Sequence, residues 1–246
     1  MPDNSQMKLG KQPHRFDSRT LKLAKYLPPS WIPEKEVDFT NGLADWGMMR
    51  NDMLGDCTIA AIAHAVQTWT QNAGSQAHLV TVPDDQIVQT YSDFCGYVPG
   101  DASTDNGGVE LDVLNLWRQK GFAGHQIVAY ADPQPQNILH VKHAISRFMG
   151  IYIGLQLPVS AQDQDLWDVV PVDGGVWGGH AVWCLAYDPD GLTCVTWGKL
   201  KKMTWDFWHR YCDESHCLFS SDLVVSHLGP ELDMAALHSD LQSVVG

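Results

Sequence analysis

The chain has 246 residues, 16 of them Lys or Arg and 29 Asp or Glu, which gives a formal net charge of −13. This acidic balance argues against nucleic acid or an anionic membrane as a partner, because both are bound through basic patches. No segment has the length of a membrane span, and residues 1–10 lack the apolar stretch of a signal peptide. We therefore expect a protein that is cytoplasmic, or exported without a recognisable signal peptide.

The order of the predicted elements indicates an α+β fold. Residues 1–35 are polar and then interrupted by prolines, and they are too short to bury a core, so they predict an extended N-terminal arm. A helical lobe is expected over 36–124, a β-rich lobe over 125–229 and a C-terminal helix over 230–246. The arm has two possible courses: across a cleft between the lobes, or behind one of them.

The predicted elements follow from apolar periodicity and from turn residues. Helices are expected over 56–69, from 83 onwards, over 109–120 and over 137–149. Strands are expected over 126–130, 151–157, 181–187 and 192–197.

The stretch 55–69 predicts a buried helix that begins at a cysteine. Gly55 permits a sharp turn, Asp56 is a good N-cap residue, and the helix from Cys57 on is apolar nearly all round. A cysteine in the first helical turn gains thiolate character from the positive end of the helix dipole. The alternative is a small buried hydrophobic residue, which is the usual role of a free cysteine. The negative charge of Asp56 would raise the thiol pKa.

A cysteine nucleophile needs a base within hydrogen-bonding reach. His64 lies on the same helix, about 10 Å along its axis from Cys57, so we interpret it as a packing or capping residue. His180 is the better candidate, because it follows a glycine-rich segment and begins an apolar strand, where it would be held rigidly beside a cleft. The alternative is a histidine at an ordinary junction between a loop and a strand.

Taken together, these stretches resemble the papain-like cysteine peptidases. The resemblance covers residues 37–210 and implies a helical N-terminal lobe and an antiparallel β C-terminal lobe with a cleft between them. Five segments carry it: Val37-Asp38-Phe39, Gly55-Asp56-Cys57, Gly107-Gly108, Gly179-His180-Ala181-Val182 and Thr196-Trp197-Gly198, with Asn51 six residues before the cysteine, where the family has its oxyanion-hole glutamine.

The resemblance implies a role for each matched residue. Cys57 would attack a carbonyl, His180 would carry the proton, and Asn51 with the Cys57 backbone N–H would stabilise the oxyanion. Gly107 and Gly108 would hold the substrate backbone, and the substrate-binding residues Gly179 and Trp197 would flank it. The family's asparagine that orients the histidine falls on Val195, so either Thr196 orients His180 or nothing does.

Three functions fit these residues. The first is a peptidase or amidase that acts on a peptide or protein through a Cys57 acyl-enzyme. The second is an acyltransferase that passes the acyl group to an amine instead of water. The third is a catalytically inactive papain-like module that binds a peptide or protein in the cleft, a reading that Val195 and Asp56 favour.

The six cysteines form no CxxC pair, so they are expected to be mostly thiols, although Cys212 and Cys217 are close enough in sequence for a disulfide. The sequence predicts no cofactor and no metal site. His209, Cys212, His216 and Cys217 have metal-binding side chains, but their spacing matches no zinc pattern. The acidic segments 101–105 and 163–168 are interpreted as solvated loops.

Overall fold

The computed structural model describes residues 4, 6–27, 32–74, 77–134, 136–220, 233, 236–237 and 239–240. The predicted C-terminal helix over 230–246 lies for the most part outside the described residues, so it stays a prediction. Within the described part of the chain there are five α-helices and eight strands, and the prediction of an α+β fold is confirmed. None of the described helices is both long and apolar enough to cross a bilayer.

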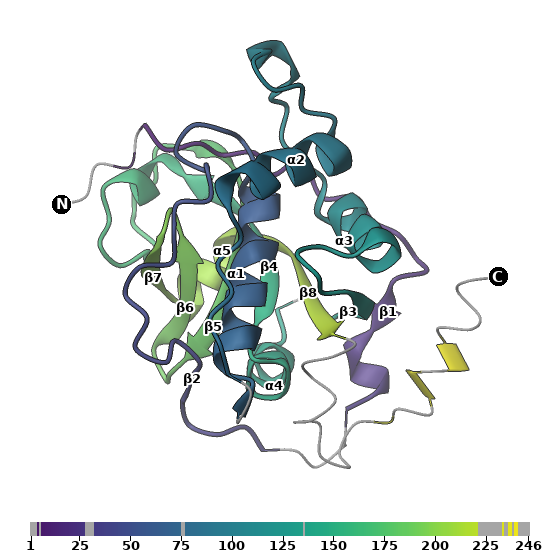
Figure 1. The fold of residues 1–246 in the computed structure, drawn as a ribbon. Coiled ribbons are helices and arrows are strands. Elements are labelled where there is room, and N and C mark those ends of the chain that lie inside the picture. The colour runs from purple at the N-terminus through teal and green to yellow at the C-terminus, as the bar shows by residue number, and fades with distance from the viewer. Residues whose placement is uncertain are drawn as a thin grey trace.

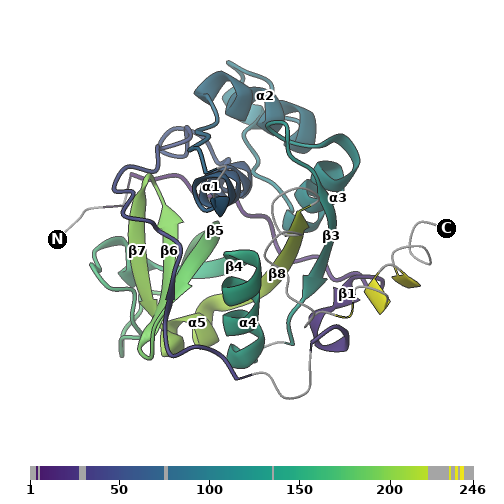
Figure 2. The same cartoon turned by 60° about the horizontal axis from the view of Figure 1, so that its bottom comes forward.

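The central helix is α1, which is buried from its first residue to Thr70. Figure 2 shows it nearly end-on, with the strands on one side and two further helices on the other. Its Ala, Ile and Val side chains fill the space between these layers, as a helix that is apolar all round requires. The helices are α1 (Cys57–Gln71), α2 (Asp84–Cys95), α3 (Glu110–Lys120), α4 (Ile138–Phe148) and α5 (Trp205–Tyr211), with 3₁₀ turns at Leu23–Lys25, Ala102–Thr104 and Val159–Gln162.

One sheet runs through the β-rich lobe in the order β1-β3-β8-β4-β5-β6-β7, and β2 pairs with β5. Its neighbours are antiparallel except for the parallel pair β1 and β3. The strands are β1 (Leu21–Lys22), β2 (Val37–Asp38), β3 (Ile127–Asp132), β4 (Ile151–Pro158), β5 (Val176–Tyr187), β6 (Gly191–Thr196), β7 (Lys199–Thr204) and β8 (Cys212–Ser220).

Strand β5 is buried on both faces, which explains its long apolar run. Ala181 and Trp183 belong to the apolar cluster beneath α1, whereas Val182 and Cys184 belong to the cluster that α4 and α5 complete on the other face. This alternation is the period-2 geometry of a strand. Because β5 begins at Val176, His180 lies inside the strand and not at its start, which corrects the prediction of a strand beginning at 181.

The N-terminal arm is part of the fold. Leu21–Lys22 forms β1 against β3, and Leu23 and Tyr26 are fully buried. In Figure 1 the purple N-terminal segment crosses the upper part of the molecule, from the side of β6 and β7 to the side of α3 and β1. Residues 10–12 bond to Gly108 and to Gly179 on β5, as the course across the cleft requires, whereas residues 21–26 pack against the β-rich lobe.

Candidate active site

Cys57 begins α1 and is completely buried. Its Sγ accepts a hydrogen bond from the backbone N–H of Ala181 on β5, at 3.4 Å. The thiol thus sits where the helix end meets the strand that carries His180. Asp56 is the N-cap residue, but its side chain makes no capping hydrogen bond, which corrects the prediction made for it.

The Asp56 carboxyl group instead faces the loop that precedes the helix. The side-chain amide of Asn51 donates to Asp56 Oδ1 at 3.2 Å and to the Leu54 carbonyl oxygen at 3.1 Å. Burial raises the pKa of Asp56 well above its usual value, so its neutral form is favoured. Both amide hydrogens of Asn51 are engaged, so its oxyanion role stays a prediction and would require the amide to release one of these acceptors.

His180 is held by the last residue of β6 and by the residue that follows it. Its Nε2 is 2.7 Å from the Thr196 hydroxyl oxygen, and its ring stacks on Trp197 with centroids 4.6 Å apart and planes 20° apart. Val195 faces the cluster beneath α1, and the next residue of the strand reaches the other face, where His180 lies. Thr196 is therefore the residue that contacts the imidazole, and the valine is a core residue.

The second ring nitrogen of His180, Nδ1, is buried and has no hydrogen-bond partner among the described residues. Cys57 Sγ is bonded to the Ala181 N–H and not to this nitrogen. Burial raises the pKa of the Cys57 thiol to about 12, an effect that the Ala181 N–H partly offsets. Burial also lowers the pKa of His180 to about 3. In this conformation both groups are therefore neutral at pH 7, and no thiolate–imidazolium pair is formed.

The N-terminal arm passes close to Cys57. The backbone of Gly10 lowers the pKa of the Cys57 thiol, and a side chain on Gly10 would meet the Gly55 carbonyl oxygen at 1.7 Å. On one side the Lys8 N–H donates to the Asn51 carbonyl oxygen at 3.3 Å, and on the other Trp197 Nε1 donates to the Lys8 carbonyl oxygen at 3.2 Å. The arm thus lies directly over the thiol as an extended peptide.

The glycines proposed to hold substrate backbone hold the arm. The Gly108 N–H donates to the Gly10 carbonyl oxygen at 2.8 Å, and the Gln12 N–H donates to the Gly108 carbonyl oxygen at 2.9 Å. The Lys11 N–H donates to the Gly179 carbonyl oxygen at 3.0 Å. A side chain on Gly107 would lie 1.8 Å from the Gly10 carbonyl oxygen, so only glycine permits this close approach.

Other residues chosen from the sequence have structural roles. His64 is buried, hydrogen-bonded through Nδ1 to Gln67 at 2.8 Å, and its pKa is lowered to about 4 by burial. Asp105 is not merely part of a solvated loop, because its carboxylate accepts from the Gly55 N–H and the Tyr91 hydroxyl. Cys212 and Cys217 are free thiols.

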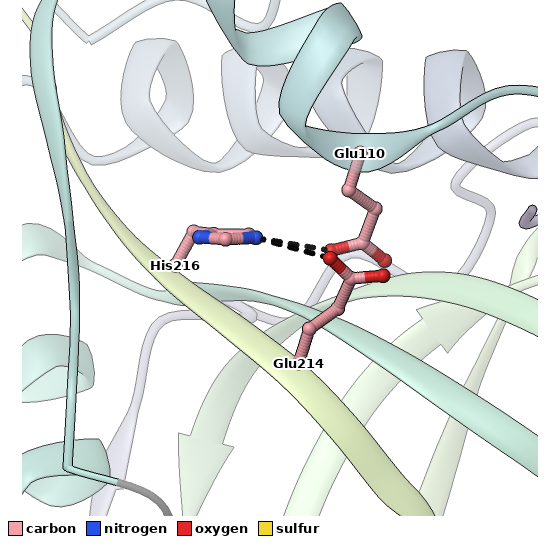
Figure 3. Close-up of side chains that lie close together, drawn as sticks. All are labelled: Glu110, Glu214 and His216. Atoms are coloured by element: carbon pink, nitrogen blue, oxygen red, sulfur yellow. Dashed lines mark hydrogen bonds and ion pairs between the residues drawn. The ribbon is translucent and has the colours of Figure 1, made fainter. Parts of the chain in front are cut away.

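Three side chains that the sequence analysis did not combine form a compact cluster beside the arm. Glu110 comes from α3, and Glu214 and His216 come from β8, with their donor atoms all within 4.8 Å of one another. Figure 3 shows both carboxylates and the imidazole turned toward a common point. Among the described residues this is the group that could hold a metal ion, and the Lys11 ammonium lies 2.8 Å from Glu214 Oε1.

The sequence contained one usable signal for this cluster. Glu214 and His216 are two residues apart on a strand, so they share a face. Neither Glu110 nor Lys11 stands out, because a single charged residue at a helix start or in a polar arm is ordinary. Their meeting depends on the path of the arm.

Comparison with solved structures identifies the fold. The chain superimposes on xylellain, a cysteine protease from Xylella fastidiosa, with a TM-score of 0.65 and 16% identity over 87% of this chain and 96% of that one. It also superimposes on digestive procathepsin L 3 of the Tenebrio molitor larval midgut, with a TM-score of 0.61 and 11% identity over 88% and 77%. The bromelain protease from Ananas comosus gives a TM-score of 0.53 and 15% identity over 76% and 99%.

No protein-family model and no curated protein sequence matches the chain. The fold is nonetheless papain-like, an α+β architecture with a β-rich lobe, shared with several cysteine proteases.

Proposed function

We propose that the chain is a papain-like thiol hydrolase, a peptidase or amidase that cleaves a peptide bond or another amide through a Cys57 acyl-enzyme. Cys57 Sγ attacks the substrate carbonyl, and its proton passes to His180 Nδ1. The leaving amine takes that proton, and water then hydrolyses the thioester. The Cys57 backbone N–H, at the head of α1, stabilises the oxyanion.

One observation carries this proposal most directly. Thr196 binds His180 Nε2 at 2.7 Å, which leaves Nδ1 as the nitrogen for proton transfer. Trp197 stacks on the ring and screens that hydrogen bond. A histidine with only a packing role needs no such arrangement around one nitrogen while the other is left unbonded in the interior, which costs free energy.

The same site is latent while the arm is bound. The arm passes close to the thiol, and burial is the main cause of both unfavourable pKa values. When the arm leaves, water and a substrate carbonyl can reach Cys57, and the pKa of the thiol falls while that of the imidazole rises. Activity therefore requires displacement of the arm.

The test uses the full chain in an open variant, defined as Gly10→Ala/Lys11→Met. The new Cβ at Gly10 collides with backbone atoms of Gly55, and the methionine removes the buried ammonium, so the arm is displaced. Lys8→Met is the matched control, because it makes the same change at an exposed position of the same arm.

Alkylation by iodoacetamide near pH 6 is measured at each cysteine by mass spectrometry, followed by hydrolysis of a fluorogenic peptide mixture. Cys57 of the open variant should react at least about tenfold faster than in the wild type, and His180→Ala should remove that gain. If Cys57 in the open variant reacts no faster than the core residue Cys184, no activated thiol exists and the proposal fails.

A peptide-binding module without catalysis is the second candidate. It is favoured by the peptide already held in the cleft and by the lack of a hydrogen bond between Cys57 and His180. In that case Cys57→Ser in the open variant would leave peptide affinity unchanged, and no peptide would be cleaved by the cysteine form. An acyltransferase would instead form an amide when an amine such as glycinamide is added, and mass spectrometry of the products detects it.

A further inference from the structure

The Lys11 ammonium is buried between carboxylates. Its Nζ lies 2.8 Å from Glu214 Oε1 and 3.0 Å from Asp213 Oδ2, and the Lys11 side chain has no exposed surface. Burial alone would lower the pKa of Lys11, but the charges of Glu110, Glu214 and Asp213 raise it above its ordinary value. The lysine is therefore fully charged, and the pocket around it is built for a cation.

The pocket walls do not depend on the arm. His216 Nδ1 is 2.7 Å from Asp132 Oδ1, and its Nε2 is 3.5 Å from Glu214 Oε2 and 3.7 Å from Glu110 Oε2 (Figure 3). These residues come from α3, β3 and β8, and they orient one another without Lys11. The cage is thus preformed when the arm leaves.

The pocket also has room for a long side chain. At Gly154 on β4, a Cβ atom would lie 2.0 Å from Lys11 Cε and 2.7 Å from Glu110 Oε1, so the absence of a side chain there makes the space for the lysine stem. A surface cavity of about 260 Å³ is also lined by Asp213, Glu214 and His216 among others.

The backbone of Lys11 is held from two sides of the cleft. Lys11 bridges to Gly108, and its N–H bonds the Gly179 carbonyl oxygen. Its neighbour Gly10 covers the thiol of Cys57. A peptide that replaces the arm and pairs with Gly108 would direct the side chain of the paired residue into the same acidic pocket, beside the bond that lies over Cys57.

Removal of the arm would take the Lys11 ammonium away from Asp213 and Glu214, and His216 would stay beside Glu214. Loss of a partner by a buried carboxylate is costly, so the vacated pocket favours a ligand that restores the positive charge. We propose that this pocket is a specificity subsite that selects a lysine or arginine side chain of a peptide substrate, with the N-terminal arm as its intramolecular occupant. This inference rests on the proposed function, because a specificity subsite presupposes a hydrolase. Selection of a basic side chain by the pocket can nevertheless be tested by binding alone.

A metal ion is the competing occupant, since Glu110, Glu214 and His216 could supply three ligands. Lys11 Nζ already lies 2.8 Å from Glu214 Oε1 and 3.0 Å from Asp213 Oδ2. The group that the structure places between the carboxylates is an ammonium, which favours a basic side chain.

The first experiment measures binding to the open variant that also carries Cys57→Ser, so that no peptide is consumed. Fluorescence anisotropy compares a labelled peptide of the arm sequence, Met7 to Pro13, with the same peptide carrying norleucine in place of Lys11. Norleucine keeps the four-carbon stem and loses the charge. We expect the lysine peptide to bind about 30-fold more tightly, as a charged hydrogen bond in a buried site permits.

Pocket variants then assign the preference to named residues. Glu214→Gln should reduce the ratio of lysine to norleucine affinity by about tenfold, and Asp213→Asn should reduce it by less, because Asp213 is partly exposed. Asp188→Asn is the control, since that carboxylate pairs with Lys202 at the β5–β6 turn. Equal affinities for the two peptides would overturn the proposal, as would Zn²⁺ binding measured by calorimetry with no lysine preference.

The second experiment measures cleavage by the open variant with Cys57 intact. A twelve-residue peptide with one lysine among Gly, Ala and Ser is compared with its norleucine counterpart, and mass spectrometry locates the cut. We expect cleavage next to or one residue away from the lysine, about 30-fold faster than in the counterpart. If both peptides are cleaved equally, the subsite inference fails and the hydrolase stands.

The remaining outcome separates the two proposals. If the lysine peptide binds preferentially and neither peptide is cleaved, the hydrolase proposal fails and the pocket is a binding site for basic peptides only. If the open variant does not fold, Lys11→Met alone is used, because it removes the ammonium from the pocket and leaves Gly10 unchanged. Its folding is checked by thermal unfolding against Lys8→Met.

Discussion

Two buried histidines flank the arm and have opposite charge states. His180, on β5, meets a threonine hydroxyl and a tryptophan ring, and burial lowers its pKa to about 3. His216, on β8, is equally buried, but its contacts with Asp132 and Glu214 raise its pKa to about 10. Burial by itself removes the charge of an imidazole, and neighbouring carboxylates restore it.

The two histidines are expected to serve different tasks in the cleft. The neutral partners of His180 leave it free to take a proton once a substrate or water replaces the arm. The carboxylates around His216 fix a charge that serves binding, and the Lys11 ammonium lies beside them. The thiol proposed for catalysis lies near Gly10 of the arm, and the pocket proposed to select a basic side chain holds the next residue, Lys11.

The largest expected effect tests the catalytic role proposed for Cys57 and His180. In the open variant, Cys57→Ser and His180→Ala should each reduce kcat/KM for peptide hydrolysis by about ten-thousand-fold or more, because each removes a group that takes part in bond making. His216→Gln should change KM for a lysine peptide far more than kcat. Equal losses of kcat in His180→Ala and His216→Gln would break the division of tasks.

The pH dependence of the free energy of unfolding should differ between the two histidines. For His216 the folded pKa of about 10 lies above the usual 6.5, so its stabilising contribution is complete below pH 6.5 and is lost as pH rises through about 10. For His180 the folded pKa of about 3 lies below 6.5, so the unfolded chain binds the proton first and stability falls as pH drops from 6.5 toward 3. Each site alone gives about 1.4 kcal/mol per pH unit.

Urea unfolding at a series of pH values measures these slopes. His216→Gln should flatten the alkaline decline in the free energy of unfolding, and His180→Gln should flatten the acidic decline. His64 and His143, whose pKa values burial lowers to about 4, add to the acidic decline in every variant. An alkaline slope that is unchanged in His216→Gln would show that the imidazolium assigned to that position does not exist.

A smaller effect is expected at Thr196. Thr196→Val removes the hydroxyl bonded to His180 Nε2 and keeps the shape, so kcat/KM of the open variant should fall about 10- to 100-fold while the fold persists. Thr196→Ser retains the hydroxyl and should recover most of the activity. If Thr196→Val is as active as the parent, His180 needs no orienting partner.

The smallest effect belongs to an ion pair in water. Lys202 and Asp188 approach to 2.6 Å, but their side chains are 37% and 34% exposed. Lys202→Met should change the free energy of unfolding by less than about 1 kcal/mol in urea titration, since solvent screens such pairs. A larger loss would mean that burial is not what distinguishes the Lys11 pocket from ordinary surface pairs.

Much of the fold follows from local pattern. The apolar run after Cys57, the amphipathic stretch of α3 and the alternation along β4 all predict the elements that the structure contains. These patterns are readable because a helix or strand must bury the face that its own residues define. The start of β5 was misplaced because glycines suggested a loop, whereas they make room for the arm against that strand.

Some residues of the candidate site could also be found from local sequence, whereas others could not. Cys57 at a helix start and His180 on an apolar strand were chosen from their immediate neighbours. The orienting residue was left open, because only the alternation of β6 against β5 decides that Val195 joins the core and Thr196 reaches the imidazole.

By itself, then, the sequence determined the class of fold and the buried helix, since both depend on periodicity over neighbouring residues, whereas the roles of Cys57 and His180 stay predictions. Tertiary structure alone decided the course of the arm, the union of Lys11 with Glu110 and Glu214, and the charge on each histidine. The physical reason is that burial and Coulomb interactions depend on distances in space, and residues more than two hundred positions apart in the chain can lie in contact.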